Sequence, residues 1–194
     1  LTLYWRALRK MERDYSLALH LLGQRTAEIA KLDTWPGAGL AATSFWRAGE
    51  LLADRYCLPI PQNVDTPTLA RLNLAVWDHD PGDRLSILLP DGQETASITF
   101  SVGRLAPAGE VKPAPTHREG SRLAGGVTLL GWDLDGEQLT LYWRTEQPLN
   151  DDLNVFLHLY AGDQKIGQAD GPPLAGDWPT SAWIPGAAFA DPHP

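Results

Sequence analysis

The hexapeptide LTLYWR occurs twice in this chain, at residues 1–6 and again at residues 139–144. The similarity extends past the hexapeptide, because residues 1–22 and 139–160 align without a gap and agree at ten positions. Two unrelated segments of this length would agree at about one position. Short solenoid repeats recur every 20–50 residues or so, and the offset here is 138 residues. The repeat therefore indicates two copies of a whole domain.

After a one-residue deletion the match resumes and pairs eight further residues: Asp33 with Asp170, Pro36 with Pro173, Gly39 with Gly176, Thr43 with Thr180, Ser44 with Ser181, Trp46 with Trp183, Gly49 with Gly186 and Asp54 with Asp191. Two complete copies do not fit into 194 residues. The segment LAGGVTLLGWDLDGEQ precedes only the second hexapeptide, and only the first copy continues past its shared aspartate into RYCLPIP. We therefore expect a tandem duplication that is cut out of phase with its domains.

Apolar residues alternate with period two in the longest shared segments. In YSLALHLL, residues 15–22, the residues Leu17, Leu19 and Leu21 fall on one side, and LNVFLHLY at residues 153–160 repeats the pattern. This alternation is typical of strands that bury one face. Five more segments have the character of strands: 27–33, 54–61, 68–78, 84–90 and 94–105.

Turn motifs such as WPGAG, DPGD and PDGQ separate these segments, and the chain contains 18 Gly and 16 Pro. Short strands at this spacing predict an all-β fold, an antiparallel β-sandwich that is either jelly-roll-like or immunoglobulin-like. The charged residues of segment 5–15 would suit a helical turn. Its counterpart contains Pro148, however, so we expect a hairpin loop in both copies.

The repeat and the composition together predict the domain boundaries. Residues 1–106 form the first copy, which lacks its leading strand, and residues 123–194 form the second copy, which is truncated at its C-terminal end. Residues 107–122 are rich in Pro, Ala and charge without alternation, which predicts a linker. Such a linker spans about 50 Å when extended, so a strand at 127–134 could fill the open slot of the first copy, or enter a second chain as a strand-swapped dimer.

Composition argues against several functions. The net charge of -8 gives no basic field, so nucleic acid and anionic lipid surfaces are not expected as partners. No apolar run reaches the length of a membrane span. Cys57 is the single cysteine, which leaves no internal disulfide and no zinc site. Since no nucleophile, metalloprotease or phosphate-loop motif is present, we expect neither a cofactor nor catalysis by this chain itself.

Several motifs taken in order resemble a known domain. They are LTLYWR, a strand ending in HLL, the D-x-x-P at residues 33–36, TSFWRAGE followed by DRY, and LNLAVWDHDPGDRL. The series is similar to a β-sandwich domain at the C-terminal end of bacterial membrane glycosyltransferases of the dolichyl-phosphate mannosyltransferase type, a domain also found in uncharacterised proteins. The resemblance covers nearly all of residues 1–106 and part of 123–194. It implies a non-catalytic accessory module on the extracytoplasmic side of a bacterial membrane, with a glycan or lipid-linked sugar as its ligand.

A candidate carbohydrate site follows from the alternation. If the first hexapeptide pairs antiparallel with the strand at 15–22, then Tyr4, Arg6 and His20 share the face opposite the aliphatic residues. Aromatic rings stack on sugars, and Arg and His donate hydrogen bonds to hydroxyl groups. Trp46 would add a second aromatic platform. The alternatives are structural: a loop covers this face above His20, and Trp46 closes the edge of the sandwich.

The segment DHDPGD is a weaker candidate for a metal site. Asp78, Asp80 and Asp83 offer the oxygen ligands that calcium prefers. The segment lacks the glutamate and glycine spacing of a calcium-binding helical loop, and DPGD is typical of a turn. We therefore expect no bound metal.

Two functions of different classes agree with these patterns. The first is a carbohydrate-binding or substrate-presenting module of a larger membrane glycosyltransferase. The second is a structural spacer or a protein-interaction β-sandwich without a small ligand. The two would show the same alternation and the same turns, so the sequence does not separate them.

Overall fold

The computed structural model of the chain describes residues 1–60, 64, 67–78, 82–107 and 112–193. It confirms the all-β prediction, because the described residues form fourteen strands in antiparallel sheets, and their helices are 3-10 turns of three or four residues. None of these helices has the length and the hydropathy needed to cross a membrane.

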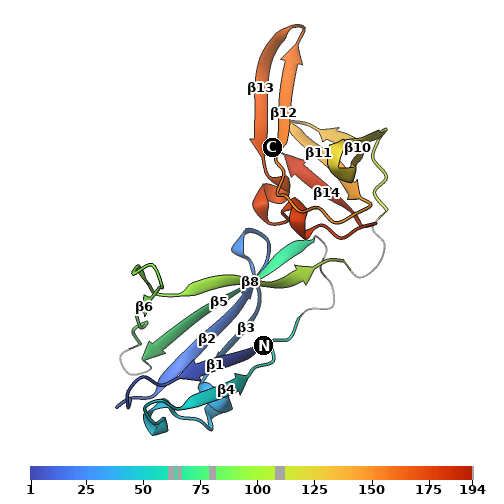
Figure 1. The fold of residues 1–194 in the computed structure, drawn as a ribbon. Coiled ribbons are helices and arrows are strands. Elements are labelled where there is room, and N and C mark those ends of the chain that lie inside the picture. Colours follow the sequence, from blue (N-terminus) through green and yellow to red (C-terminus); the bar gives the residue numbers. More distant parts are fainter. Residues whose placement is uncertain (61–63, 65–66, 79–81, 108–111, 194) are drawn as a thin grey trace. The chain divides into compact units, whose positions relative to one another are not determined.

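The chain divides into two compact units (Figure 1). Unit 1 comprises Leu1–Pro61 and Ala70–Gly103, and unit 2 comprises Gln62–Leu69 and Arg104–Pro194. The predicted first copy extended to residue 106 without interruption, so its limits differ from those of unit 1. The difference arises because a compact unit is defined by packing, whereas a repeat is defined by sequence.

Eight strands lie wholly or mostly in unit 1: β1 (Thr2–Arg6), β2 (Tyr15–Leu22), β3 (Glu28–Thr34), β4 (Leu51–Arg55), β5 (Thr68–Asp78), β6 (Ile87–Leu88), β7 (Glu94–Thr95) and β8 (Ile98–Leu105). Three 3-10 turns lie between them: η1 (Gln24–Thr26), η2 (Pro36–Gly39) and η3 (Thr43–Phe45). β1 pairs with β4 in one sheet, a second sheet has the order β3-β2-β5-β8, and β6 with β7 forms a small hairpin.

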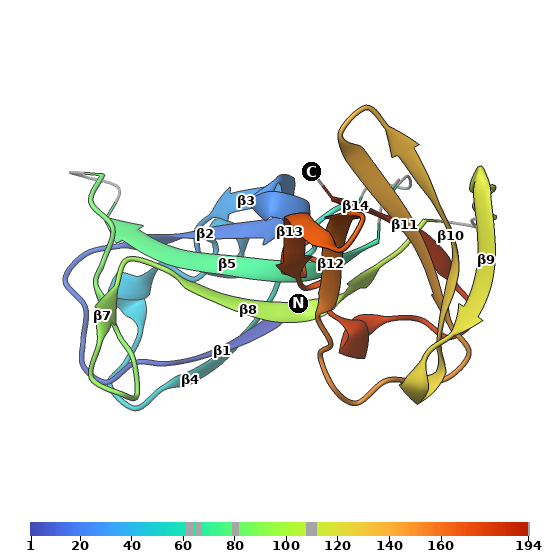
Figure 2. The ribbon, with the colours of Figure 1, turned by 90° about the horizontal axis from the view of Figure 1, so that it is seen from above.

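The two sheets of unit 1 pack face to face around an aliphatic core (Figure 2). Leu17, Leu19 and Leu72 are at most 2% exposed, because alternation places them on the inner face of the four-stranded sheet. Leu3 and Trp5 of β1 pack against this core from the other sheet. The arrangement is that of an antiparallel β-sandwich, as the sequence predicts.

Unit 2 contains the remaining strands: β9 (His117–Arg122), β10 (Val127–Asp135), β11 (Gln138–Thr145), β12 (Val155–Ala161), β13 (Gln164–Gly171) and β14 (Ala188–His193). Its 3-10 turns are η4 (Ala124–Gly126), η5 (Pro173–Gly176) and η6 (Thr180–Ala182). The four-stranded sheet has the order β14-β11-β10-β9, and β12 with β13 forms a hairpin that projects from the unit (Figure 1).

The duplication is visible in the pairing of the strands. The pair β1–β4 of unit 1 corresponds to β11–β14 of unit 2, and the two registers agree. Leu3 lies opposite Asp54 in the first pair, and Leu141 lies opposite Asp191 in the second. The hairpin β2–β3 corresponds in the same way to β12–β13. Each repeated segment of sequence therefore forms the same element twice.

The units differ in the strands that extend these shared pairs. β11 has β10 on its second edge, whereas β1 pairs only with β4 among the described residues. Conversely, β2 has β5 on its second edge, whereas β12 pairs only with β13 in the described part of the chain. Each unit thus extends one of its two shared strand pairs to four strands, but the extended pair is not the same one.

Three predictions about connections are wrong. β1 and β2 lie in different sheets, so residues 7–14 cross between sheets and do not form a hairpin loop. The predicted linker 107–122 contains β9, which pairs with β10. Finally, β10 pairs with β9 and β11 of its own unit, so within this chain it does not fill the slot beside β1. The predicted strand at 54–61 also ends early, at Arg55.

Candidate functional site

The predicted carbohydrate face is not formed. Because β1 and β2 belong to opposite sheets, Tyr4 and Arg6 point outward from one sheet and His20 points outward from the other. Tyr4 is 72% exposed. The ring of His20 instead lies between two carboxylates, at 3.4 Å from Glu28 and 3.1 Å from Asp33. The prediction is wrong because alternation tells on which side of a strand a residue lies, but not which strand is its neighbour.

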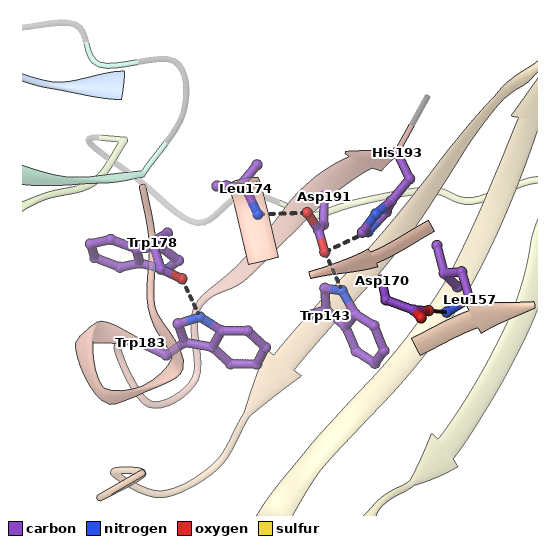
Figure 3. A network of polar contacts seen from close by, with 8 residues as sticks. All are labelled: Trp143, Leu157, Asp170, Leu174, Trp178, Trp183, Asp191 and His193. Carbon is purple, nitrogen blue, oxygen red and sulfur yellow. Dashed lines mark hydrogen bonds and ion pairs between the residues drawn. The ribbon is translucent and has the colours of Figure 1, made fainter. Parts of the chain in front are cut away.

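Trp46 is part of the core and exposes little of its surface. Its side chain is 7% exposed, its Nε1 donates a hydrogen bond to the carbonyl of Ala41 at 3.0 Å, and its ring lies 6.4 Å from that of Trp5. Trp183 repeats the arrangement in unit 2, donating to the carbonyl of Trp178 at 3.0 Å (Figure 3). The structural alternative therefore accounts for this repeated tryptophan.

The repeated threonine connects the start of one strand to a 3-10 turn. In unit 1, Thr43 accepts a hydrogen bond from the amide of Tyr15 at 3.0 Å and donates to the carbonyl of Arg13 at 2.9 Å. Thr180 makes the same two hydrogen bonds in unit 2 and is 2% exposed. Its conservation between the copies reflects the fold.

The repeated aspartate before each of these strands has a similar role. Asp14 accepts a hydrogen bond from the amide of Ser44 at 2.8 Å, and Asp152 accepts one from Ser181 at 3.0 Å. The hydrogen bonds from Ser181 lower the pKa of the Asp152 carboxyl group, because they stabilise its charged form.

A buried carboxylate forms the centre of the polar network in unit 2 (Figure 3). Asp191 is 0% exposed and accepts hydrogen bonds from the amide of Leu174 at 2.8 Å and from Nε1 of Trp143 at 3.0 Å. Nε2 of His193 lies 2.9 Å from the same carboxylate. These contacts join β11, β14 and η5, so Asp191 holds three elements together.

The equivalent carboxylate in unit 1 has different side-chain partners. Asp54 accepts hydrogen bonds from the amide of Gly37 at 2.8 Å and from the hydroxyl group of Tyr56, which occupies the place of His193. Burial raises the pKa of the Tyr56 phenol, and the hydrogen bond and negative charge of Asp54 raise it further. The repeated aspartate is structural in both units.

The exposure of Tyr4 follows from the missing neighbour of β1. Its counterpart Tyr142 donates a hydrogen bond at 2.8 Å to Asp133, which lies on β10. Asp133 also accepts a hydrogen bond from the amide of Thr116 at 2.6 Å. The hydrogen bonds from Thr116 and then Tyr142 lower the pKa of Asp133, and the bond to Asp133 raises the pKa of Tyr142. Tyr4 has no strand beside it, in the described residues, to supply such a partner.

The weak calcium candidates are not assembled into a site. Asp78 is buried and forms an ion pair with Arg13 at 2.8 Å. Asp83 is exposed, and Asp80 lies outside the described residues. Within the part of the chain that the structure describes, no group of three or more His, Cys, Asp or Glu residues is placed to hold a metal ion.

Both units contain a tryptophan-lined pocket at equivalent positions. The volumes are about 360 Å³ in unit 1 and about 310 Å³ in unit 2. Six lining residues correspond in pairs: Trp5 and Trp143, Tyr15 and Leu153, Leu17 and Val155, Pro36 and Pro173, Thr43 and Thr180, and Trp46 and Trp183. In unit 1, Arg6 and Arg9 add positive charge to the lining.

A larger groove, of about 550 Å³, lies in unit 2 between the sheet and the β12–β13 hairpin. Its apolar lining includes Trp132, Leu134, Leu139, Leu141, Leu157 and Leu159. Leu159 is 62% exposed, whereas its counterpart Leu21 in unit 1 is 5% exposed. The difference follows from β5, since Leu72 lies opposite Leu21 there. The edge of β12 that corresponds to the β5-bearing edge of β2 has no strand beside it among the described residues.

The sequence analysis missed this groove, although a signal was present. Residues 153–160 are a counterpart of residues 15–22, but the described part of the second copy holds no counterpart of residues 68–78, and β12 pairs there with β13 alone. No family model matches the chain, and no curated protein and no solved structure matches it significantly.

Proposed function

We propose that this chain is a non-catalytic interaction module, a β-sandwich that binds an apolar polypeptide segment through the groove of unit 2. The contrast between Leu21 and Leu159 supports this most directly, because the same position is core in one unit and exposed in the other. Burying a leucine side chain contributes about 1.5–3 kcal/mol, so an apolar groove of this size favours an occupant. Contiguous exposed apolar surface commonly marks a binding site.

The roles of the repeated polar residues support binding over catalysis. Asp54, Asp191 and Thr180 are all buried, and their hydrogen bonds connect strands to the 3-10 turns. These side chains are used to satisfy backbone groups that the fold would otherwise bury without partners. The residues that the two copies share are thus explained by stability.

The sequence resemblance suggests a setting for this module. The order of motifs from LTLYWR to LNLAVWDHDPGDRL favours an accessory domain of a larger membrane glycosyltransferase, on the extracytoplasmic side of a bacterial membrane. In that setting the module would position a partner protein relative to the enzyme. The net charge of -8 agrees with a partner other than nucleic acid.

Site-specific photo-cross-linking in the cells that make this protein tests the interaction. With a photoreactive amino acid at Leu159, we expect cross-links to one defined polypeptide segment. Gln93, which is exposed in a turn of unit 1, is the control position and should give no such product. The same products from both positions, or none from Leu159, would contradict the proposal.

Glycan binding is a second candidate function, favoured by the equivalent pockets of the two units. The pocket of unit 1 combines Trp5 and Tyr15 with Arg6 and Arg9, a mixture of apolar surface and hydrogen-bond donors that suits a sugar. Screening the chain against a broad glycan array tests this idea. A saccharide that binds wild type and binds Arg9→Ala about tenfold more weakly would support it, and an array without hits would reject it.

A further inference from the structure

The two equivalent tryptophan-lined pockets differ in the charge of the segments beside them. Segment 6–13 connects the lining residues Trp5 and Tyr15 and holds four basic residues and one acidic residue. Segment 144–151 connects Trp143 and Leu153 in the same way and holds one basic residue and two acidic residues. The net charge of the segment is therefore +3 in unit 1 and -1 in unit 2.

Arg6 and its counterpart Arg144 show the origin of part of this difference. In unit 2, Arg144 forms an ion pair with Glu146 at 2.9 Å, and neither residue lines the pocket. In unit 1, the position of Glu146 is occupied by Leu8. Arg6 lines the pocket, and no carboxylate of the described residues forms an ion pair with it.

Arg9 adds a second positive charge to the lining of the same pocket. Its counterpart Gln147 is uncharged and donates a hydrogen bond to the carbonyl of Gly125 at 3.1 Å. Arg9 is exposed and has no ion pair in the part of the chain that the structure describes. Guanidinium groups pair with carboxylates and phosphates through two parallel hydrogen bonds. The pocket of unit 1 thus combines apolar walls with two cations that have no counter-charge.

The cavity itself is a property of the repeated domain. It occurs in both units with six matched lining residues, although β11 has β10 beside it and β1 pairs only with β4 among the described residues. Unit 2 therefore serves as an internal control, because it has a cavity of similar volume without the two cations.

We propose that the pocket of unit 1 binds a small organic anion, a carboxylate or a phosphate on an apolar body. The apolar body lies against Trp5 and Leu17, and the anionic group pairs with Arg6 and Arg9. The volume of about 360 Å³ falls within the range of small-molecule sites. This site is separate from the groove of unit 2, and it goes beyond the glycan candidate by requiring a negative charge on the ligand.

Decanoate and decyl phosphate, kept below the concentrations at which they form micelles, are the probes. Decanol, which has the same chain without a charge, is the matched control. In calorimetric titration of the full chain, at least one of the two anions should bind about tenfold or more tightly than decanol. Hydrogen exchange should slow in residues 7–14 and in β2, and it should not change in β12.

The second copy supplies the variants that test the two cations. Leu8→Glu gives Arg6 the partner that Arg144 has, and Arg9→Gln removes the second charge. Leu8 is 87% exposed and Arg9 is also exposed, so both variants should fold. Each should weaken anion binding about tenfold, and Arg9→Gln should leave decanol binding unchanged.

Lys10→Gln is the matched control variant, because it removes a positive charge from the same loop at a residue that does not line the pocket. It should change the affinity less than about twofold, since an exposed charge is screened by salt. A loss as large as that of Arg9→Gln would show general attraction to the basic loop and overturn the proposed site.

Three other results would also overturn the proposal. They are equal affinity for decanol and for the anions, no binding of either anion, and anion protection in β12 instead of β2. If neither anion binds while neutral saccharides bind wild type and bind Arg9→Ala more weakly, the organic-anion site is wrong and the glycan function survives. Cross-linking at Leu159 is unaffected by any of these results.

Discussion

Asp54 and Asp191 occupy the same place in the two units, yet their side-chain partners differ: Tyr56 donates to Asp54, whereas Trp143 and His193 contact Asp191. A buried carboxylate needs donors, and a phenol or an imidazole can supply one equally well. The backbone donor from η2 or η5 is common to both. This explains why the aspartate is repeated while its side-chain partner is not.

Replacing Asp191 by Asn tests how much this network contributes to stability. The asparagine amide has nearly the same shape as the carboxylate, but it carries no charge. Its NH₂ group cannot accept the hydrogen bonds that the Leu174 amide and Trp143 Nε1 donate to Asp191. We expect unit 2 to lose about 3 kcal/mol of unfolding free energy. Hydrogen exchange of β11 and β14 under native conditions measures this loss.

The control for this prediction is Asp163→Asn in the exposed turn between β12 and β13. It should change the stability by less than about 0.5 kcal/mol. A loss in Asp191→Asn no larger than that of the control would show that the buried carboxylate does not hold unit 2 together.

Individual strands were predicted correctly where an alternating apolar pattern spans the whole strand. β2 and β5 follow the alternating segments 15–22 and 68–78 closely, because both bury one face in the sandwich. β9 escaped notice because it is exposed along its length and therefore shows no alternation of buried and exposed residues. The predicted pairing of β1 with β2 was wrong for a related reason. Pairing depends on tertiary contacts that period-two alternation does not encode.

The pairing of β9 with β10 depends on Gly131. It lies at an irregularity in the register of β10, and a Cβ atom there would come within 2.3 Å of the carbonyl oxygen of His117. Backbone cannot move aside as a flexible side chain can. We therefore expect Gly131→Ala to separate β9 from β10 and to destabilise unit 2 by about 1–3 kcal/mol.

Hydrogen exchange of β9 and denaturant unfolding measure the two effects of Gly131→Ala. Gly171→Ala is the matched control in the same unit, since its added methyl group meets no atom within 4 Å. It should be neutral or slightly stabilising. Equal behaviour of the two variants would contradict a steric role for Gly131.

At the scale of the whole molecule, the described residues form two hydrophobic cores. The core of unit 1 is built around Leu17, Leu19 and Leu72. The core of unit 2 is built around tryptophans, with Trp183 packed edge-on against Phe189 at a centroid distance of 4.7 Å. The duplication was evident in the sequence. The groove became evident only in the structure, where the strands beside β2 and β12 could be compared.

Two cores predict two unfolding transitions, which single substitutions should separate. Leu19 is 0% exposed and Phe189 is 4% exposed, so truncating either leaves a cavity in one core only. Leu19→Ala should destabilise unit 1 by about 2–5 kcal/mol, and Phe189→Ala should destabilise unit 2 by about 3–5 kcal/mol. Hydrogen exchange read by mass spectrometry assigns each loss, because peptides from β2 and β14 report on different units. If either variant lowers the protection of both strands equally, the two units unfold as one cooperative structure. The groove of unit 2 would then be lost whenever unit 1 unfolds.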